Sequence, residues 1–178
     1  MTIVIYFCLH RKSEFMNVKI NYQPIGYIQT PFNTVSDMPI QPSGAEGAEG
    51  IIELDPGFVP GLSDLDGFSH LILIYHFHLV KGHKLCVVPF MDDKPHGIFA
   101  TRAPARPNPI GISTVKLKKM ENNLIYIEGV DMVNGTPLLD IKPYFAPYDN
   151  RPDSISGWLK DKSDVDIAKV KSDNRFGQ

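Results

Sequence analysis

The chain has 178 residues and a formal net charge of −2, with 43% hydrophobic and 21% charged residues. This composition is that of one ordinary globular domain, and it excludes a strongly basic nucleic-acid-binding protein, so any contact with phosphates needs a local basic patch. Two cysteines, Cys8 and Cys86, exclude a disulfide framework and favour a reducing, cytoplasmic location.

Residues 1–17 are predicted to be an N-terminal extension. Their apolar run, Thr2–Leu9, is too short to span a membrane, and charged residues follow it instead of preceding it, unlike a signal peptide. The sequence from Met16 reads like the start of the domain, so the extension is either the product of an upstream start codon or a loosely attached strand. We therefore expect the domain at 18–148 and a polar tail with at most one short helix at 149–178.

Most of the domain reads as short strands rich in β-branched and aromatic residues. The expected strand segments are 18–30, 51–55, 68–80, 83–90, 111–121, 123–133 and 138–145. Segment 68–80 is apolar on both parities at first, as in a strand buried on both faces. With a tight turn at Asn134-Gly135 and no G-x-G-x-x-G unit, the pattern predicts a mainly all-β fold, an antiparallel barrel or sandwich with few short helices and long loops.

Three histidines on segment 68–80, namely His70, His76 and His78, share one parity and are expected to project from one face. Such a set on a β-barrel is compatible with a metal site, but no acidic ligand stands at a matching spacing. We expect no metal; in that case the histidines hydrogen bond within the fold or line a pocket.

The segment "TRAPARPNPIGIS", 101–113, carries two arginines and three prolines. The guanidinium groups of Arg102 and Arg106 suit carboxylate or phosphate ligands, and each proline fixes its φ angle. A stiff loop of this kind positions side chains before a ligand arrives. The alternative is a rigid connection whose arginines pair with surface acids.

The segment "DMVNGTPLLDIKPY", 131–144, carries Asp131 before a tight turn and Asp140 after it. Both carboxylates are candidate acceptors for an amine or a ribose. The alternative for Asp140 is an ion pair with an arginine of the proline-rich loop, and the sequence leaves both readings open.

Taken together, "GIFATRAPARPNPIGIS", "DGFSHLILIYHFH" and "NGTPLLDIKPY", following "IGYIQTPF", closely resemble the TsaA-like family, also called the TrmO family. The resemblance spans roughly residues 25–147. It implies a small antiparallel β-barrel that forms a homodimer, uses S-adenosyl-L-methionine and has no metal. It further implies methylation of the exocyclic nitrogen of threonylcarbamoyl-adenosine beside the tRNA anticodon, in the cytoplasm.

The resemblance also implies a cofactor site drawn from four segments. Ile40 stands where the family has arginine, Leu79 where it has glutamine, and Asn134 where it has aspartate. The implied cofactor residues are Pro39, Ile40, Gln41, His78, Leu79, Arg102, Asp131, Met132, Val133 and Asn134.

For the substrate, the resemblance places Arg106 and Asn108 against a phosphate or the threonyl carboxylate. The reaction is an in-line attack of nitrogen on the sulfonium methyl group, in which alignment supplies much of the rate. Asp140 or Tyr144 is the expected acceptor of the proton that the nitrogen loses. In a dimer, Arg106 or the basic segment 116–119 could reach the partner's pocket.

Three alternatives remain from the sequence. The first is a methyltransferase of the same family that acts on a small molecule or another nucleoside. The second is a binding module for S-adenosylmethionine without catalysis, for which Ile40 and Leu79 are the signs. The third is a metalloenzyme that uses the histidines of segment 68–80.

Overall fold

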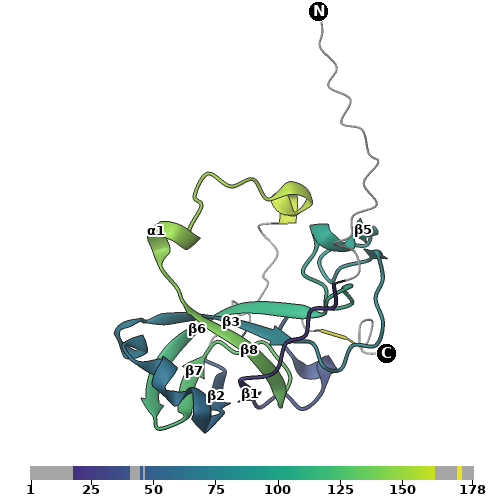
Figure 1. Cartoon of the computed structure of the whole chain (residues 1–178). Coiled ribbons are helices and arrows are strands. Elements are labelled where there is room, and N and C mark those ends of the chain that lie inside the picture. The colour runs from purple at the N-terminus through teal and green to yellow at the C-terminus, as the bar shows by residue number, and fades with distance from the viewer. Residues whose placement is uncertain (1–17, 41–44, 46, 163–171, 174–178) are drawn as a thin grey trace, which may run out of the picture.

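The computed structural model describes residues 18–40, 45, 47–162 and 172–173. Six antiparallel strands form a closed barrel in the order β1-β2-β7-β6-β3-β8, and β8 pairs back with β1 (Figure 1). The strands are β1 Gly26–Gln29, β2 Glu49–Leu54, β3 His70–His76, β6 Ile110–Glu121, β7 Leu124–Glu128 and β8 Thr136–Pro143. The expected fold class, a mainly all-β antiparallel barrel, is confirmed. The expected N-terminal extension lies outside the described residues.

The other elements are short and lie outside the barrel wall. β4 Cys86–Val87 pairs with β5 His96–Gly97 in a separate two-stranded sheet. The helical turns are η2 Val35–Asp37, η4 Pro56–Leu62, η5 Leu65–Gly67, η6 Ile98–Ala100, α1 Ala146–Asp149 and η7 Gly157–Lys162. Within the described part of the chain, no helix has the length and apolar character needed to cross a membrane.

Besides segment 68–80, of which only His70–His76 is strand, three expected strands are shorter in the structure than the sequence pattern indicates. Of segment 18–30 only Gly26–Gln29 is strand, and Pro24 just before it has no N–H to donate to a ladder. Segment 83–90 keeps only the two residues of β4, and Pro89 follows closely. The strand expected over 123–133 ends at Glu128, and the residues after it form the loop that leads to the site.

The barrel core is built from the inward-facing side chains of all six strands. In β3, for example, Leu71 and Leu73 are fully buried, as are Val115 in β6 and Ile125 in β7. Each such side chain stabilises the fold by about 1.5–3 kcal/mol relative to an exposed one. A second, smaller cluster packs beneath the proline-rich loop and consists of Val87, Ile98, Ala103 and Ala105.

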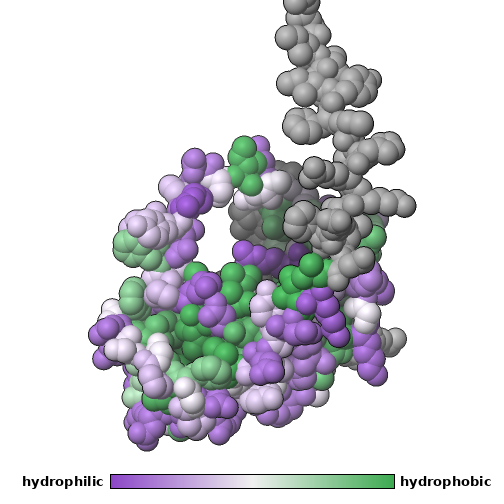
Figure 2. All heavy atoms as spheres, viewed as in Figure 1, coloured by the Kyte–Doolittle hydropathy of each residue, from purple (hydrophilic) through white to green (hydrophobic). Residues whose placement is uncertain are grey.

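The outer face of β3 is less buried than predicted. Ile72 and Ile74 are only half-buried, and Ile112, opposite Ile74 on β6, is 55% exposed. Figure 2 shows apolar side chains gathered on the barrel wall in the area of β3, β6 and β8. We call Ile72, Ile74, Ile110 and Ile112 the apolar wall.

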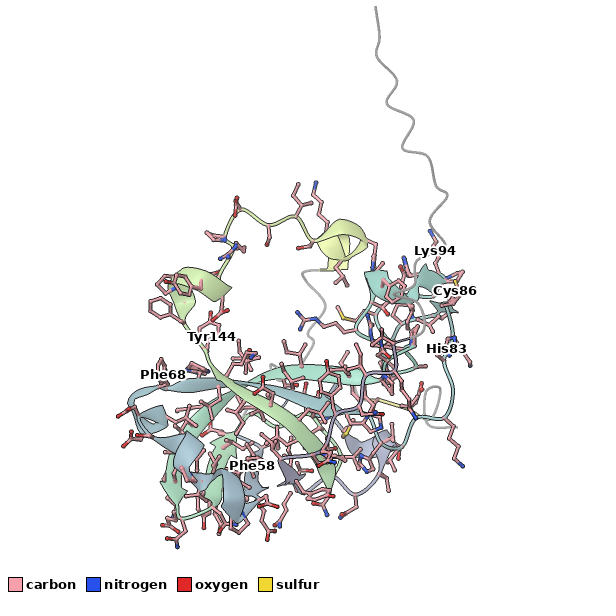
Figure 3. All side chains as sticks on the ribbon, viewed as in Figure 1. Phe58, Phe68, His83, Cys86, Lys94 and Tyr144 are labelled. Carbon is pink, nitrogen blue, oxygen red and sulfur yellow. The ribbon has the colours of Figure 1, made fainter. Side chains whose placement is uncertain are left out.

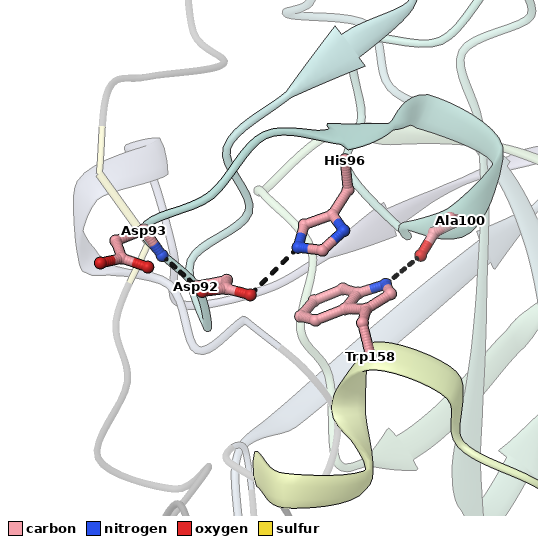
Figure 4. A network of polar contacts seen from close by, with 5 residues as sticks. All are labelled: Asp92, Asp93, His96, Ala100 and Trp158. Atoms are coloured by element: carbon pink, nitrogen blue, oxygen red, sulfur yellow. Dashed lines mark hydrogen bonds and ion pairs between the residues drawn. The ribbon is translucent and has the colours of Figure 1, made fainter.

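The C-terminal segment leaves β8, arches over the barrel and returns beside β5 (Figure 1). There, Trp158 of η7 donates its indole N–H to the carbonyl oxygen of Ala100 at 2.8 Å (Figure 4). The indole stacks on His96 with ring centroids 4.3 Å apart, and His96 Nε2 lies 3.0 Å from an Asp92 carboxylate oxygen. The segment is thus docked immediately before the proline-rich loop.

Gly26→Ala tests how closely β1 must approach β2. A Cβ at Gly26 would collide with the carbonyl oxygen of Glu53 and lie 2.9 Å from Leu54 Cα, and backbone atoms inside a closed barrel cannot move aside. We expect a loss of about 2 kcal/mol in the free energy of unfolding, measured by urea denaturation. The control is Gly61→Ala, where a Cβ meets nothing within 4 Å. Equal stability of the two variants would contradict the prediction.

Candidate functional site

One end of the barrel brings together the chain segments that the sequence analysis singled out. There β3 ends while β6 and β8 begin, and the chain after β7 reaches this end by continuing along β6. In the β6–β7 register Lys116 lies opposite Glu128, and following the two strands three residues further brings Ser113 opposite Asp131. The loop after β7 therefore carries Asp131 to the start of β6.

A hydrogen-bonded series of three side chains crosses this end. The Ser113 hydroxyl donates to Asp131 Oδ1 at 2.6 Å, and the Tyr75 hydroxyl lies 3.0 Å from the same serine oxygen. A serine hydroxyl has one proton, so Tyr75 donates to Ser113. The ring of Tyr75 packs over Gly111, where a Cβ would collide with the rings of Tyr75 and Phe77.

Burial controls the protonation of this series. It raises the pKa of Asp131 from 3.8 to about 6, against the opposing effects of the Ser113 hydrogen bond, the aspartate's own backbone amide and the positive charge of Arg102. Burial also raises the pKa of Tyr75 above its usual range, and the negative charge of Asp131 adds to this rise. At pH 7 the aspartate is therefore mostly ionised and the tyrosine is neutral.

Tyr75 and Ser113 were not among the predicted site residues. Their signal was present, because Ser113 is a polar residue at an inward position of β6, two residues before the buried Val115. A polar side chain in a barrel interior needs a partner. The sequence did not reveal that the partner would be Asp131.

Arg106 holds the proline-rich loop together. Its Nη1 donates to the carbonyl oxygens of Thr101 at 2.8 Å, Ile98 at 3.2 Å and Ala103 at 3.4 Å. Its guanidinium group also lies 5.8 Å from the centre of the Phe99 ring. Much of its donor capacity is thus used inside the loop, so its predicted contact with substrate stays a prediction.

Arg102, four residues earlier in the same loop, differs from Arg106 in both exposure and partners. Its side chain is exposed and makes no hydrogen bond or ion pair with any described residue. Its charge is nevertheless near enough to lower the pKa of Asp131 and of Tyr75. Arg102 is therefore the arginine that can offer its guanidinium fork to a ligand at this end of the barrel.

His78 and Leu79 lie in a turn directly after β3, next to the proline-rich loop. The turn is fixed by the Phe77 amide, which donates to the Pro109 carbonyl at 2.8 Å, and by the Val80 amide, which donates to Phe77 at 3.2 Å. Both residues are largely exposed. The part of the His78 side chain that is buried, together with the charge of the neighbouring His76, lowers the pKa of His78. A neutral imidazole at this place is available as a hydrogen-bond partner.

Asn134 ties the loop after β7 to the segment after β1. Its Oδ1 accepts from the Thr30 amide at 3.1 Å, and its Nδ2 donates to Asn33 Oδ1 at 3.2 Å. An aspartate could make only the first of these bonds. The backbone carbonyl of buried Met132 accepts from the Thr30 hydroxyl at 2.9 Å. Val133, which follows Met132 in the sequence, is half-buried.

The first long loop is described only in part, and Gln41 lies outside the described residues. Pro39 is buried and Ile40 is half-buried after η2. The amide of Ser172 donates to the Met38 carbonyl at 3.0 Å, and its hydroxyl donates to the Val35 carbonyl. No described hydrogen bond joins Pro39 or Ile40 to the other expected cofactor residues, so their role stays a prediction.

Asp140 lies on the outer face of β8. It forms an ion pair with Lys142 at 2.7 Å, and its Oδ1 accepts from the Ile141 amide at 2.9 Å. The partner that the sequence left open is therefore a lysine of the same strand and not an arginine of the proline-rich loop. Asp140 pairs with Ile74 on β3, one residue before Tyr75, but on the outer face of the barrel.

Tyr144 lies at the other end of β3 from the Asp131 series. Its amide donates to the His70 carbonyl at 3.0 Å, and the two rings meet edge-on with centroids 6.2 Å apart. Five strand residues, about 17 Å, separate His70 from Tyr75. Figure 3 shows Tyr144 below α1, far from His83 and from Cys86 of β4. Within one chain the structure does not bring Tyr144 to Arg102 and Asp131, and Asn108 is exposed in the loop.

The histidines do not form a cluster. His70 and His76 stand at opposite ends of β3, six residues or about 20 Å apart. His70 Nδ1 lies 2.9 Å from the Ser69 hydroxyl. Among the described residues no group of three or more His, Cys, Asp or Glu could hold a metal ion.

A groove of about 670 Å³ lies on the other side of the barrel and meets the predicted residues only at Asn134. Two of its lysines are already paired, Lys118 with Glu128 and Lys119 with Glu121, each at 2.7 Å. The charged groups near Arg102 indicate the place of a ligand better than this groove does. The lining residues are Gln29, Thr30, Pro31, Glu49, Gly50, Ile51, Lys118, Lys119, Tyr126, Ile127 and Asn134.

The chain is similar to proteins of a known family. The model of the tRNA-methyltransferase O N-terminal domain matches residues 27–150. A probable S-adenosyl-L-methionine-binding protein of Pyrococcus abyssi is 51% identical over 88% of this chain and 85% of its own. The human tRNA (adenine(37)-N6)-methyltransferase is 36% identical over 78% of this chain but 33% of its own length.

The structure is also similar to solved ones. The crystal structure of TrmO from Pseudomonas aeruginosa superimposes with a TM-score of 0.68 at 37% identity. The match covers 79% of this chain and 63% of that chain. The chain therefore spans less than two thirds of the crystallised protein and about a third of the human one.

Asp131→Asn tests the cost of the buried carboxylate. The pKa of Asp131 is raised from 3.8 to about 6, so ionising this carboxyl costs more in the folded state than in the unfolded state. The folded state loses this stability as the pH rises to 6 and above. A shift of about two pKa units corresponds to about 3 kcal/mol. We expect the Asn variant to unfold several degrees higher than wild type at pH 7.5, in thermal melts followed by circular dichroism. Near pH 4 the difference should vanish. An Asn variant less stable than wild type at pH 7.5 would contradict the prediction.

Proposed function

Because the chain belongs to the family of the tRNA-methyltransferase O N-terminal domain, we propose that it is an S-adenosylmethionine-dependent tRNA methyltransferase. The observation that carries the proposal is Arg102, which has no partner among the described residues and lies near enough to Asp131 to lower the pKa of its carboxyl. These two residues come from two of the segments that the family resemblance assigns to the cofactor. The name of the Pyrococcus abyssi relative supports the cofactor, and the name of the human relative supports adenine 37 of tRNA as the target.

The proposed substrate is the exocyclic nitrogen of threonylcarbamoyl-adenosine. This nitrogen attacks the methyl group of S-adenosylmethionine in line with the departing sulfur, so a nitrogen–carbon bond forms and the carbon–sulfur bond breaks. Sulfur takes the electron pair and becomes a neutral thioether. The barrel contributes mainly by holding the two reactants in line. A tRNA substrate places this activity in the cytoplasm.

The nitrogen must also lose a proton. Asp140 and Tyr144 remain the proposed acceptors; Asp140 lies opposite Ile74 of the apolar wall, and the Tyr144 ring meets that of His70 at the start of β3. Reaching a reactive centre from there requires a neighbouring molecule. The proposed homodimer offers one, because a partner docked on the apolar wall would meet these two residues.

We propose the apolar wall as the homodimer surface. Ile110 and Ile112 are 39% and 55% exposed on adjacent outward positions of β6. Exposed isoleucines that form a continuous patch are usually covered by a partner. The aromatic pair of the C-terminal arch, Phe145 and Tyr148, is also exposed, with ring centroids 4.7 Å apart.

For tRNA, the proposed contact is a local patch that includes Lys116. Lys118 and Lys119 already have glutamate partners, whereas Lys116 makes no ion pair with a described residue. Lys116 lies opposite His70 on β3. The patch is therefore at the end of the barrel wall from which Tyr144 departs.

The proposed function is tested first by calorimetric titration with S-adenosylmethionine. We expect micromolar binding by wild type and at least a tenfold loss for Arg102→Ala, because an arginine that binds a carboxylate contributes more than a neutral hydrogen bond. Methyl transfer is then measured on tRNA with and without the threonylcarbamoyl group. Binding without transfer to any tRNA would favour a binding module, and no binding would overturn the proposal.

Ile112→Glu tests the proposed dimer surface. A carboxylate in the middle of an apolar interface must be buried unpaired, so we expect a monomer in light scattering where wild type is a dimer. Ile20→Glu is the matched control, because Ile20 is 68% exposed outside the apolar wall. A dimer that survives Ile112→Glu, or a monomeric wild type, would exclude this surface.

A further inference from the structure

Phe99 is exposed although the backbone on both sides of it is fixed. It lies in η6, and its side chain is 77% exposed, more than that of any other aromatic residue in the described part of the chain. The Ile98 amide before it donates to the Leu85 carbonyl at 2.9 Å, and the Ala100 carbonyl after it accepts from the Trp158 indole at 2.8 Å. An exposed apolar side chain is common in proteins, but here the backbone that carries it is rigid.

Arg106 fixes the orientation of the Phe99 ring from one side. Its guanidinium carbon lies over the ring at 5.8 Å from the ring centre, within the range of a cation–π contact. The guanidinium group is itself held, because Nη1 donates to the carbonyl oxygens of Thr101 and Ile98. The opposite face of a fixed aromatic ring is therefore open to solvent.

The surroundings of Phe99 are basic. Residues 81–106 contain three lysines and two arginines against two aspartates, although the whole chain has a net charge of −2. Lys81, Lys84 and Lys94 are exposed and form no ion pair with a described residue. The Lys84 amide donates to the Ala105 carbonyl at 3.0 Å, so this lysine lies against the proline-rich loop.

Phe58 in η4 offers a direct contrast. It is 51% exposed, and residues 49–66 contain five acidic residues and no lysine or arginine. Figure 3 shows Phe58 far from His83 and Lys94, which belong to the basic loops. Two exposed phenylalanines of the same fold thus lie in surroundings of opposite charge, and of the two only Phe99 suits a polyanion.

A ligand that complements this surface has a flat aromatic group with negative charges close to it. An unpaired RNA base has both, because bases that leave their stack pack on aromatic side chains while the phosphates bind lysine and arginine. A base inside a duplex is stacked on its neighbours and does not reach the ring. A protein partner would cover the ring with apolar side chains and would have no need of the lysines.

We propose that Phe99 is the stacking platform for an unpaired base of the RNA substrate, and that the exposed lysines of residues 81–94 bind phosphates of the same strand. This inference rests on the proposed function. It goes beyond that function because it assigns one side chain to an RNA base and adds a second RNA contact to the patch that includes Lys116. The proposed target lies beside the anticodon, in a hairpin loop whose bases are unpaired.

The experiment measures the binding of two labelled RNAs by fluorescence anisotropy, an anticodon stem-loop hairpin and a fully paired duplex of the same length. We expect Phe99→Ala to weaken hairpin binding about tenfold and to leave duplex binding unchanged, because stacking needs an unpaired base. Phe99→Tyr keeps the flat ring and should bind the hairpin as wild type does. Phe99→Leu keeps only the apolar bulk and should behave like Phe99→Ala.

Lys84→Ala separates the charge from the ring. A lysine that binds a phosphate contributes to the affinity for either RNA, so this variant should weaken hairpin and duplex alike and reduce the salt dependence of binding. Phe58→Ala is the matched control for the ring, because it removes an exposed phenylalanine in acidic surroundings and should change neither affinity.

Two further measurements on Phe99→Ala exclude other occupants of the ring. Calorimetry with S-adenosylmethionine and light scattering should give the wild-type cofactor affinity and oligomeric state. A loss of cofactor affinity would assign the ring to the cofactor pocket, and a changed oligomeric state would assign it to a contact between copies. Either result overturns the inference, as does an equal effect, or none, on the two RNAs.

The inference and the proposed function fail in different ways. If wild type binds and methylates tRNA while Phe99→Ala binds the hairpin equally well, only the inference is overturned. If wild type binds S-adenosylmethionine but neither RNA, the tRNA part of the proposed function is overturned as well.

Discussion

Closure of the barrel by the pairing of β1 with β8 is the constraint on which the other features depend. β1 has four residues, yet it pairs with β2 on one side and β8 on the other. Gly26 permits the close approach to β2, and fully buried Ile28 anchors β1 in the core. The same closure sets the turn before β8, because the Asn134 amide donates to the Phe32 carbonyl at 2.7 Å. The loop that carries Asp131 is therefore held, where it enters β8, by the pairing that closes the barrel.

The site costs the fold some stability. Burial of the Asp131 carboxylate disfavours its ionised form, and only the Ser113 hydrogen bond, a backbone amide and the positive charge of Arg102 offset this cost. A barrel selected for stability alone would place an apolar residue there. A ligand with a positive group would supply the missing compensation, so the same feature that weakens the free protein favours binding.

The two arginines of the proline-rich loop, Arg102 and Arg106, have different surroundings. Arg106 binds two carbonyl oxygens of its own loop and that of Ile98 in η6, which stiffens a segment that has few backbone hydrogen bonds of its own. Arg102 does not share that task, and it makes no hydrogen bond or ion pair with a described residue. The small cluster around Ile98 and the indole of Trp158, which binds the Ala100 carbonyl, support the loop from two sides. Rigidity and an available charge are thus supplied by different residues.

The sequence by itself determined the mainly all-β fold class, because alternating apolar residues with turn residues between them bury a core in an antiparallel barrel or sandwich. It also identified Arg102 and Asp131, through the long motifs around them. The tertiary structure decided which arginine has no partner among the described residues, that Asp140 pairs with Lys142, and that Ser113 and Tyr75 are connected to Asp131 by hydrogen bonds. These facts depend on strand register: residues 38 and 18 positions apart become neighbours only when β3, β6 and the loop after β7 are aligned. A linear pattern shows which residues can take part in such contacts, whereas the register selects the ones that do.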